Sequence, residues 1–274
     1  MKRILLIVVA LMTTLLADAR QIRILAIGNS FSQDSVEQYL WEIGESEGVD
    51  LIIGNMYIGG CSLQTHHGHM LSGAPAYAYR KIAGDGVKRE TRNMNLEAAL
   101  ADEEWDYVTL QQASGFSGQY ETYNPYVADL LAFVRSHVKK GCKVGWHMTW
   151  AYQSDSNHGH FPFYDRDQMK MYQAIVSCAR KVQDDCTFDF IVPSGTAGQN
   201  ARTSALGDTM TRDGFHMNLL YGRYVLACTW FETICGKKVG KKAFYPEGVT
   251  SEQAAIARKS AHSAVRKPYV VTEI

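Results

Sequence analysis

Five short apolar runs alternate with helical stretches along most of the chain, and this alternation is the feature that most constrains the fold. The runs lie at residues 22–27, 50–58, 107–111, 143–148 and 188–192. Short apolar runs bounded by turn residues predict buried strands. Strands that alternate with helices predict parallel pairing through right-handed crossovers. We therefore expect a three-layer α/β sandwich, with its functional side chains on loops at the carboxyl ends of the strands.

The expected helices share an amphipathic or apolar pattern bounded by cap-type residues. They are predicted at residues 36–46, 96–104, 124–140, 165–182, 217–235 and 251–265. Residues 63–93 are polar and rich in Gly, His and Tyr, so we expect a long excursion there. The length suits one domain over residues 20–274. Lys plus Arg equals Asp plus Glu at 28 each, which argues against a nucleic-acid or anionic-membrane surface.

The first 19 residues have the three parts of a secretory signal peptide. Lys2 and Arg3 precede an apolar run at 4–16, and Ala17-Asp18-Ala19 follows as a small-x-small cleavage pattern. The apolar run is shorter than the roughly 20 residues that a transmembrane helix needs. We expect cleavage near Ala19 and a secreted or periplasmic mature protein without a membrane segment. In such a compartment Cys178 and Cys186 could pair, although we expect mostly buried free thiols.

The loop after the first expected strand, Gly28-Asn29-Ser30-Phe31-Ser32, places serines at a turn into a helix. The free backbone N–H groups at the start of a helix can stabilise an oxyanion. Ser30 is therefore a candidate nucleophile. Ser32 lies closer to the expected helix and is the better candidate for its N-cap.

The next two strand ends offer donors for an oxyanion hole. Gly60 follows the second strand and can bring a backbone N–H close to a reacting atom. Gln111 and Gln112 end the third strand, and a side-chain amide can donate to a developing oxyanion. Because successive strand residues face opposite ways, only one of the two glutamines can point into the site.

The segment Asp213-Gly214-Phe215-His216 precedes the last long apolar helix. A carboxylate three residues before a histidine can bind Nδ1 and leave Nε2 free to accept a serine proton. An Asp-x-x-His pair alone is weakly specific. Its position after the serine, glycine and amide loops favours a catalytic pair.

These motifs, in this order, resemble those of the SGNH (GDSL-like) hydrolase superfamily. The Gly-Asn-Ser-Phe-Ser, Leu-Gln-Gln and Asp-Gly-Phe-His set is similar to a secreted bacterial branch known mainly as a domain of unknown function. The resemblance covers nearly all of residues 20–274. It implies a five-stranded parallel sheet in flavodoxin-like order flanked by helices. It also implies ester hydrolysis through an acyl-enzyme, with no metal or other cofactor.

The resemblance also assigns roles within the site. It implies Ser30 as nucleophile, His216 as general base and Asp213 as the partner of His216. The backbone N–H groups of Ser30 and Gly60 are the implied oxyanion donors. The Gly-x-Asn motif of the family is absent here, so we assign its role to Gln112.

Aromatic residues with polar neighbours follow the third and fourth strands, and such rings suit the apolar faces of sugars. Ordinary loop packing would explain them equally well. The expected partner is a small-molecule or glycan ester, and for a secreted SGNH enzyme with such loops we expect removal of O-acetyl groups from carbohydrate. The candidate substrate contacts are Asn29, Gln111, Trp150, Tyr152 and Asn200.

Two other classes of function remain open at this point. The first alternative is a metal-dependent phosphoesterase, which the histidines at 66, 67, 69, 158 and 160 suggest, although their spacing fits no zinc set. The second alternative is a catalytically inactive glycan-binding protein, which the missing Gly-x-Asn motif suggests. The first alternative predicts that a chelator abolishes activity, and the second predicts sugar binding that survives Ser30→Ala.

Overall fold

A computed structural model of the chain describes residues 21–274, and the expected signal peptide lies outside them. The strands are β1 (Gln21–Gly28), β2 (Asp50–Tyr57), β3 (Tyr77–Ile82), β4 (Arg89–Met94), β5 (Tyr107–Leu110), β6 (Lys143–His147) and β7 (Phe190–Val192). The α-helices are α1 (Ser30–Val36), α2 (Leu40–Ser46), α3 (Leu63–Ser72), α4 (Leu96–Ala101), α5 (Tyr126–His137), α6 (Gln168–Cys186), α7 (Ser194–Arg202), α8 (Tyr221–Cys235) and α9 (Ser251–Arg266). Three 3₁₀ helices are η1 (Ser114–Phe116), η2 (Tyr120–Thr122) and η3 (Phe161–Tyr164).

The five predicted strands form the parallel part of one sheet, as expected. The strand order is β4-β3-β2-β1-β5-β6-β7. The order of the parallel strands, β2-β1-β5-β6-β7, is that of a flavodoxin-like sheet. In register, Ile27 of β1 lies beside Met56 of β2 and Leu110 of β5, so the carboxyl ends of these strands share one edge.

The sheet has two further strands that the sequence did not predict. The segment expected as a polar excursion contains α3 and an antiparallel hairpin, in which β3 pairs with β2 and β4 pairs with β3. Every residue of β4 except Met94 is exposed. A charged strand at a sheet edge has no apolar run to mark it, and such charges protect the edge from pairing with another chain.

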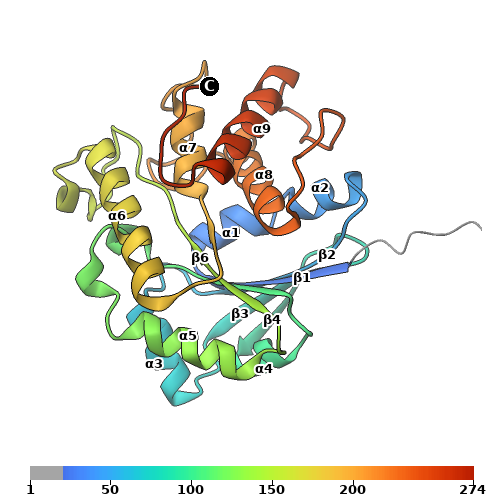
Figure 1. Cartoon of the computed structure of the whole chain (residues 1–274), viewed down its shortest axis with the longest axis vertical. Helices are drawn as coiled ribbons and strands as arrows, with labels where there is room; N and C mark the ends of the chain where they lie inside the picture. The colour runs from blue at the N-terminus through green and yellow to red at the C-terminus, as the bar shows by residue number, and fades with distance from the viewer. Residues whose placement is uncertain (1–20) are drawn as a thin grey trace, which may run out of the picture.

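Helices cover both faces of the sheet, which gives the three expected layers (Figure 1). α1, α2, α7, α8 and α9 lie on one face, and α3, α4, α5 and α6 lie on the other. The apolar helix α8 is almost wholly buried because it packs between α9, α7 and the first two helices.

The helices differ from the prediction in two places, one after β1 and one after β7. The helix expected at 36–46 begins only at Leu40 and is preceded by a separate α1, because Tyr39 adopts a left-handed conformation with φ 69°. α7 was not predicted because Ser, Gly, Thr and Asn dominate its nine residues, and these are weak helix formers.

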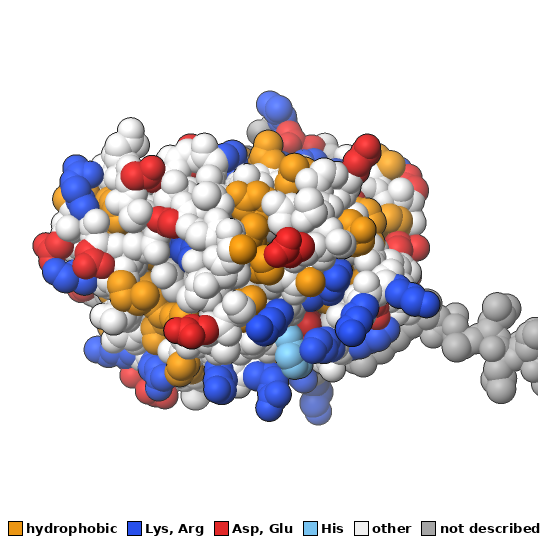
Figure 2. All heavy atoms as spheres, turned by 90° about the horizontal axis from the view of Figure 1, so that it is seen from above, with side chains coloured by type: hydrophobic (Ala, Val, Ile, Leu, Met, Phe, Trp, Pro, Cys, Tyr) orange, Lys and Arg blue, Asp and Glu red, His pale blue; other side chains and the backbone are white. Residues whose placement is uncertain are grey.

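Figure 2 views the molecule from the side of α7 and α9 and shows charged side chains of both signs with hydrophobic side chains between them. No helix within residues 21–274 is long and apolar enough to cross a membrane. Cys178 and Cys186 are not joined by a disulfide in this structure.

Candidate active site

Ser30 lies at the carboxyl edge of the sheet, where β1 turns into α1. Asn29 is the N-cap of α1, and its side-chain oxygen accepts a hydrogen bond from the Phe31 N–H at 2.9 Å. Ser32 is therefore not the cap; its hydroxyl bonds the Asn29 carbonyl instead. Gly28 is required by close packing, since a Cβ there would lie 2.7–2.8 Å from Ser32 and Gln111.

Ser30, His216 and Asp213 form one hydrogen-bonded chain. His216 Nε2 lies 2.8 Å from Ser30 Oγ, and His216 Nδ1 lies 2.7 Å from Asp213 Oδ2. An ionised carboxylate only accepts, so Nδ1 carries the proton and Nε2 accepts from the Ser30 hydroxyl. The chain is open to solvent, because the side chains of His216 and Asp213 are 20% and 39% exposed. The arrangement can activate Ser30 as a nucleophile.

Asp213 stays ionised in this setting. Partial burial acts to raise its pKa, but hydrogen bonds from the His216 ring and from the backbone N–H groups of His216 and Phe215 outweigh it. The net result is a pKa below the usual value for an aspartate. The same backbone bonds, at 2.7 and 3.2 Å to Oδ1, hold the carboxylate beside Nδ1 of the imidazole ring.

The loop that carries Asp213 and His216 is closed and then fixed to the body of the protein. Thr211 and Met217 pair across its base. Trp150 Nε1 donates to the Phe215 carbonyl at 2.7 Å, and the Trp150 ring stacks on Phe31 with centroids 4.0 Å apart. Because Phe31 follows Ser30 in α1, this stack joins the turn that carries Ser30 (the nucleophile turn, 28–31) to the loop that carries His216 (the histidine loop, 211–217).

A buried ion cluster makes a second connection between α1 and the histidine loop. Asp34 of α1 has a fully buried side chain and accepts hydrogen bonds from Arg212, Arg223 and the Met217 N–H. Arg212 also donates to the Met217 carbonyl at 2.6 Å. Asp34 thus fixes the residues on both sides of Asp213–His216. Sequence alone does not reveal this role of Asp34, because Asp34 and Arg223 are far apart in the chain and belong to no motif.

We expect Asp34→Asn to lower the free energy of unfolding by about 3–5 kcal/mol, because it leaves the buried Arg223 guanidinium without its counter-charge. Urea unfolding monitored by circular dichroism measures this. The matched control is Asp85→Asn, since the Asp85–Arg89 pair is exposed and should contribute little. Equal stability losses in the two variants would contradict a special role for Asp34.

Two of the predicted substrate contacts, Asn29 and Gln111, are buried and support the nucleophile turn instead. Gln111 Nε2 donates to Asn29 Oδ1, and Gln111 Oε1 accepts from His147 Nδ1 at 2.8 Å. His147 Nε2 must then accept, and Ser194 Oγ lies 2.9 Å from it. Burial lowers the pKa of His147 to about 3, so the ring stays neutral.

The other three predicted substrate contacts are also fully buried. Trp150 supports the Phe215 carbonyl, as described above. The Tyr152 hydroxyl lies 2.9 Å from Ser114 Oγ. Asn200 donates to the Ser260 carbonyl and accepts from the Thr272 N–H, which joins α7 to α9 and the C-terminal segment. Because they are buried, none of these side chains is available to a substrate in this structure. A sequence pattern does not show whether the fold already uses a polar group, so the sequence could not exclude them.

Of the three predicted oxyanion donors, Ser30 and Gly60 lie on loops that are tied together, whereas the Gln112 side chain has other partners. Ser30 begins α1, so its N–H has no acceptor within the helix. Gly60 is exposed with φ 66°, and Asn29 Nδ2 donates to the Cys61 carbonyl at 3.0 Å, which ties the Gly60 loop to the nucleophile turn. The assignment of Gln112 is not supported. Its amide nitrogen donates to Thr122, and its oxygen accepts from two backbone N–H groups.

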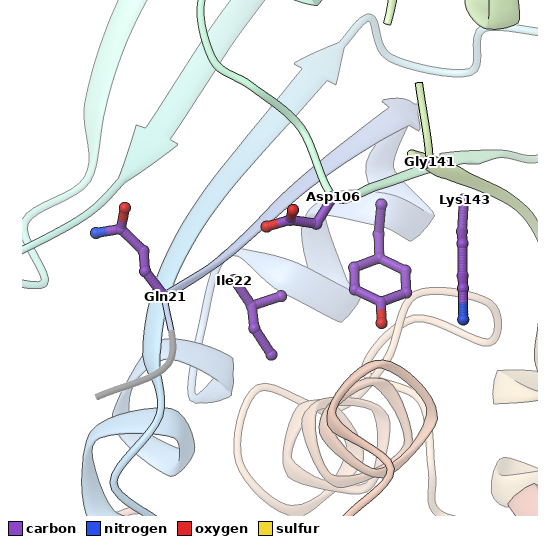
Figure 3. Close-up of a pocket in the computed structure, with 6 residues that line it drawn as sticks. Gln21, Ile22, Asp106, Gly141 and Lys143 are labelled. Atoms are coloured by element: carbon purple, nitrogen blue, oxygen red, sulfur yellow. The ribbon is translucent and has the colours of Figure 1, made fainter. Parts of the chain in front are cut away.

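The cavity beside Asp213 is polar, and its volume is about 270 Å³. Its lining contains no aliphatic or aromatic side chain and consists of Gln153, Asp155, Ser156, Asn157, Thr211, Arg212, Asp213 and Gly214. A separate cavity of about 190 Å³ lies among Gln21, Asp106 and Lys143, where β1, β5 and β6 begin (Figure 3). It is therefore at the opposite edge of the sheet from Ser30.

The histidines considered as metal ligands have other partners. His66 and His67 lie on α3, where His66 pairs with the Tyr77 hydroxyl and His67 with Asp129. Across residues 21–274, no three His, Cys, Asp or Glu side chains come together as a metal site.

Residues 23–264 match the model of a family described as a domain of unknown function, DUF4886. The chain belongs to this family. A crystal structure of a DUF4886 family protein from Bacteroides uniformis is 50% identical, with a TM-score of 0.91, and the match covers 93% of this chain and 98% of that one. None of the curated proteins matches.

More distant solved structures share the fold. A proposed SGNH hydrolase from Slackia heliotrinireducens is 21% identical with a TM-score of 0.54, over 78% of this chain and 99% of that one. Axe2, an acetylxylan esterase from Geobacillus stearothermophilus, is 11% identical with a TM-score of 0.51, over 78% and 94%. This DUF4886 chain therefore has the fold of the SGNH hydrolases, as the sequence motifs implied.

Proposed function

We propose that this protein is a serine esterase that removes O-acetyl groups from carbohydrate outside the cytoplasm. The observation that carries the proposal is the hydrogen-bonded chain from Ser30 Oγ through His216 to Asp213 at 2.8 and 2.7 Å. Its place at the carboxyl edge of a parallel sheet, in the fold of SGNH hydrolases, supports the same reading.

The proposed reaction follows from the geometry of these groups. His216 Nε2 takes the Ser30 proton as Oγ attacks the ester carbonyl, and the N–H groups of Ser30 and Gly60 stabilise the tetrahedral oxyanion. The intermediate collapses to an acyl-serine, and the leaving alcohol takes the proton from His216. Water then loses a proton to His216 and attacks the acyl group, which releases the acid and restores the Ser30 hydroxyl. Asp213 stabilises the imidazolium in both steps.

The polar lining of the cavity beside Asp213 supports a hydroxyl-rich substrate over a fatty acyl chain. The hydroxyl groups of a sugar can form hydrogen bonds with this lining. An aliphatic chain would leave the polar groups of the cavity without hydrogen-bond partners. The acetyl part of the proposal is supported by the activity of Axe2, an acetylxylan esterase that shares the fold. The wholly extracytoplasmic placement rests on the signal-peptide pattern of the first 19 residues.

The test is an assay of purified residues 20–274 on p-nitrophenyl acetate and acetylated xylo-oligosaccharides, with and without EDTA. We expect turnover of both that EDTA does not change. Loss of activity in EDTA would favour a metal-dependent esterase or phosphoesterase. Sugar binding without turnover of either ester would favour the inactive glycan-binding protein.

A further inference from the structure

A continuous line of aromatic rings leads away from the catalytic histidine. Phe215 belongs to the histidine loop, His158 and His160 follow β6, Phe163 is in η3, and Phe116 is in η1. His158, His160 and Phe163 belong to one segment, whereas Phe116 and Phe215 come from distant parts of the chain, so the fold brings three segments together. We call these five residues the ring ridge.

Each ring of the ridge contacts the next. Phe215 lies 4.1 Å from His216 and 4.7 Å from His158, measured between ring centroids. His158 lies 5.4 Å from His160, and His160 lies 5.1 Å from Phe163 and 4.9 Å from Phe116. The ridge therefore begins in contact with the reacting centre and ends at the protein surface.

The packing of the ridge is specific. A Cβ on Gly115 would lie 2.0 Å from the His160 ring, so the glycine makes room for this histidine. The His160 N–H donates to His158 Nδ1 at 3.1 Å, which leaves the Nε2 proton of neutral His158 available as a donor. Burial, together with nearby His160 and His216, lowers the pKa of His158, so the ring is neutral at pH 7.

The ridge is also accessible. Phe163 is 53% exposed, and the other four members are partly exposed. Flat apolar faces interrupted by ring N–H donors match the two kinds of surface of a sugar, which presents C–H faces and hydroxyl edges. A fatty chain would make no use of the ring N–H groups.

We propose that the ring ridge binds the sugar rings of an oligosaccharide whose ester group is held at Ser30. This proposal rests on the proposed esterase function and adds to it the polymeric nature of the substrate. The oligosaccharide extends from the acetylated residue at Phe215 toward Phe163. A small ester such as p-nitrophenyl acetate reaches Ser30 without touching Phe163.

The test compares Phe163→Ala with wild type on two substrates. We expect kcat/KM on acetylated xylo-oligosaccharides to fall by about 3- to 10-fold, the effect of losing one stacked ring. We expect kcat/KM on p-nitrophenyl acetate to remain unchanged, and Phe163→Tyr to restore oligosaccharide hydrolysis. The matched control is Val87→Ala, because Val87 is equally exposed and lies in the β3–β4 turn at the opposite edge of the sheet.

The outcomes separate the ridge from the esterase function. Equal effects of Phe163→Ala on both substrates, or no effect on either, would overturn the ridge while leaving the esterase intact. If wild type hydrolyses neither ester, calorimetric titration with xylo-oligosaccharide decides the matter. Binding that weakens in Phe163→Ala but not in Val87→Ala would support the ridge without catalysis, and absence of binding would overturn it.

Discussion

Replacing Ser30 with alanine is expected to lower kcat on p-nitrophenyl acetate by about 10⁶-fold. The reason is that the proposed mechanism forms the acyl-enzyme on Ser30 Oγ, and removal of a triad nucleophile has an effect of this size. His216→Ala should cost about as much, and the double variant little more, because the two groups act as a unit.

The fold should survive the Ser30→Ala change. Among residues 21–274 the Ser30 hydroxyl bonds only to His216, which keeps its bond to Asp213. Circular dichroism and thermal unfolding should therefore match wild type. Ser72→Ala, which removes an exposed hydroxyl on α3, is the control and should keep full activity. Turnover that persists in purified Ser30→Ala would remove Ser30 as the nucleophile.

The contact between Ser30, His216 and Asp213 could be predicted from sequence because local patterns determine the positions of these residues. A strand that ends in Gly28 and turns into a helix places Ser30 at the sheet edge whatever the rest of the chain does. Asp213 and His216 are three residues apart on one turn, so their contact requires no distant partner. The chain order of the motifs then fixes which loops meet.

The supporting groups could not be predicted, because their partners are distant in sequence. Gln112 and Asn200 have side-chain amides that a site could use. In the fold, however, these amides already donate to the carbonyl groups of Thr122 and Ser260. Asp34 is an ordinary acidic residue until α8 and the histidine loop bring two arginines against it. Hydrogen-bond satisfaction is a property of the whole fold, so residue type and spacing alone do not reveal it.

The same limit applies to the sheet. Apolar runs marked the five parallel strands because helices bury both faces of these strands. The β3–β4 hairpin lies at the edge, where Arg89–Met94 is exposed along most of its length. A strand that buries little has no pattern to distinguish it from a loop.

Asp213→Asn is expected to lower kcat by about 10⁴-fold, as loss of the carboxylate does in other serine triads. The amide oxygen can still accept the backbone bonds that Oδ1 now receives from Phe215 and His216, so the loop should keep its shape. The amide N–H₂ would face His216 Nδ1 and favour the tautomer with the proton on Nε2. That tautomer cannot accept the proton of Ser30, and the imidazolium would also lose its counter-charge.

The pH dependence separates this catalytic role from a structural one. The pKa of Asp213 is held below its usual value, so the wild-type carboxylate remains charged at all pH values above about 4. The deficit of Asp213→Asn should therefore be present throughout pH 5–9. Asp85→Asn removes an exposed carboxylate from the β3–β4 turn, away from the site, and should leave kcat within about twofold of wild type, as most surface substitutions do. A loss of less than tenfold in Asp213→Asn would instead make Asp213 a cap for the loop, with His216 acting as a base unaided.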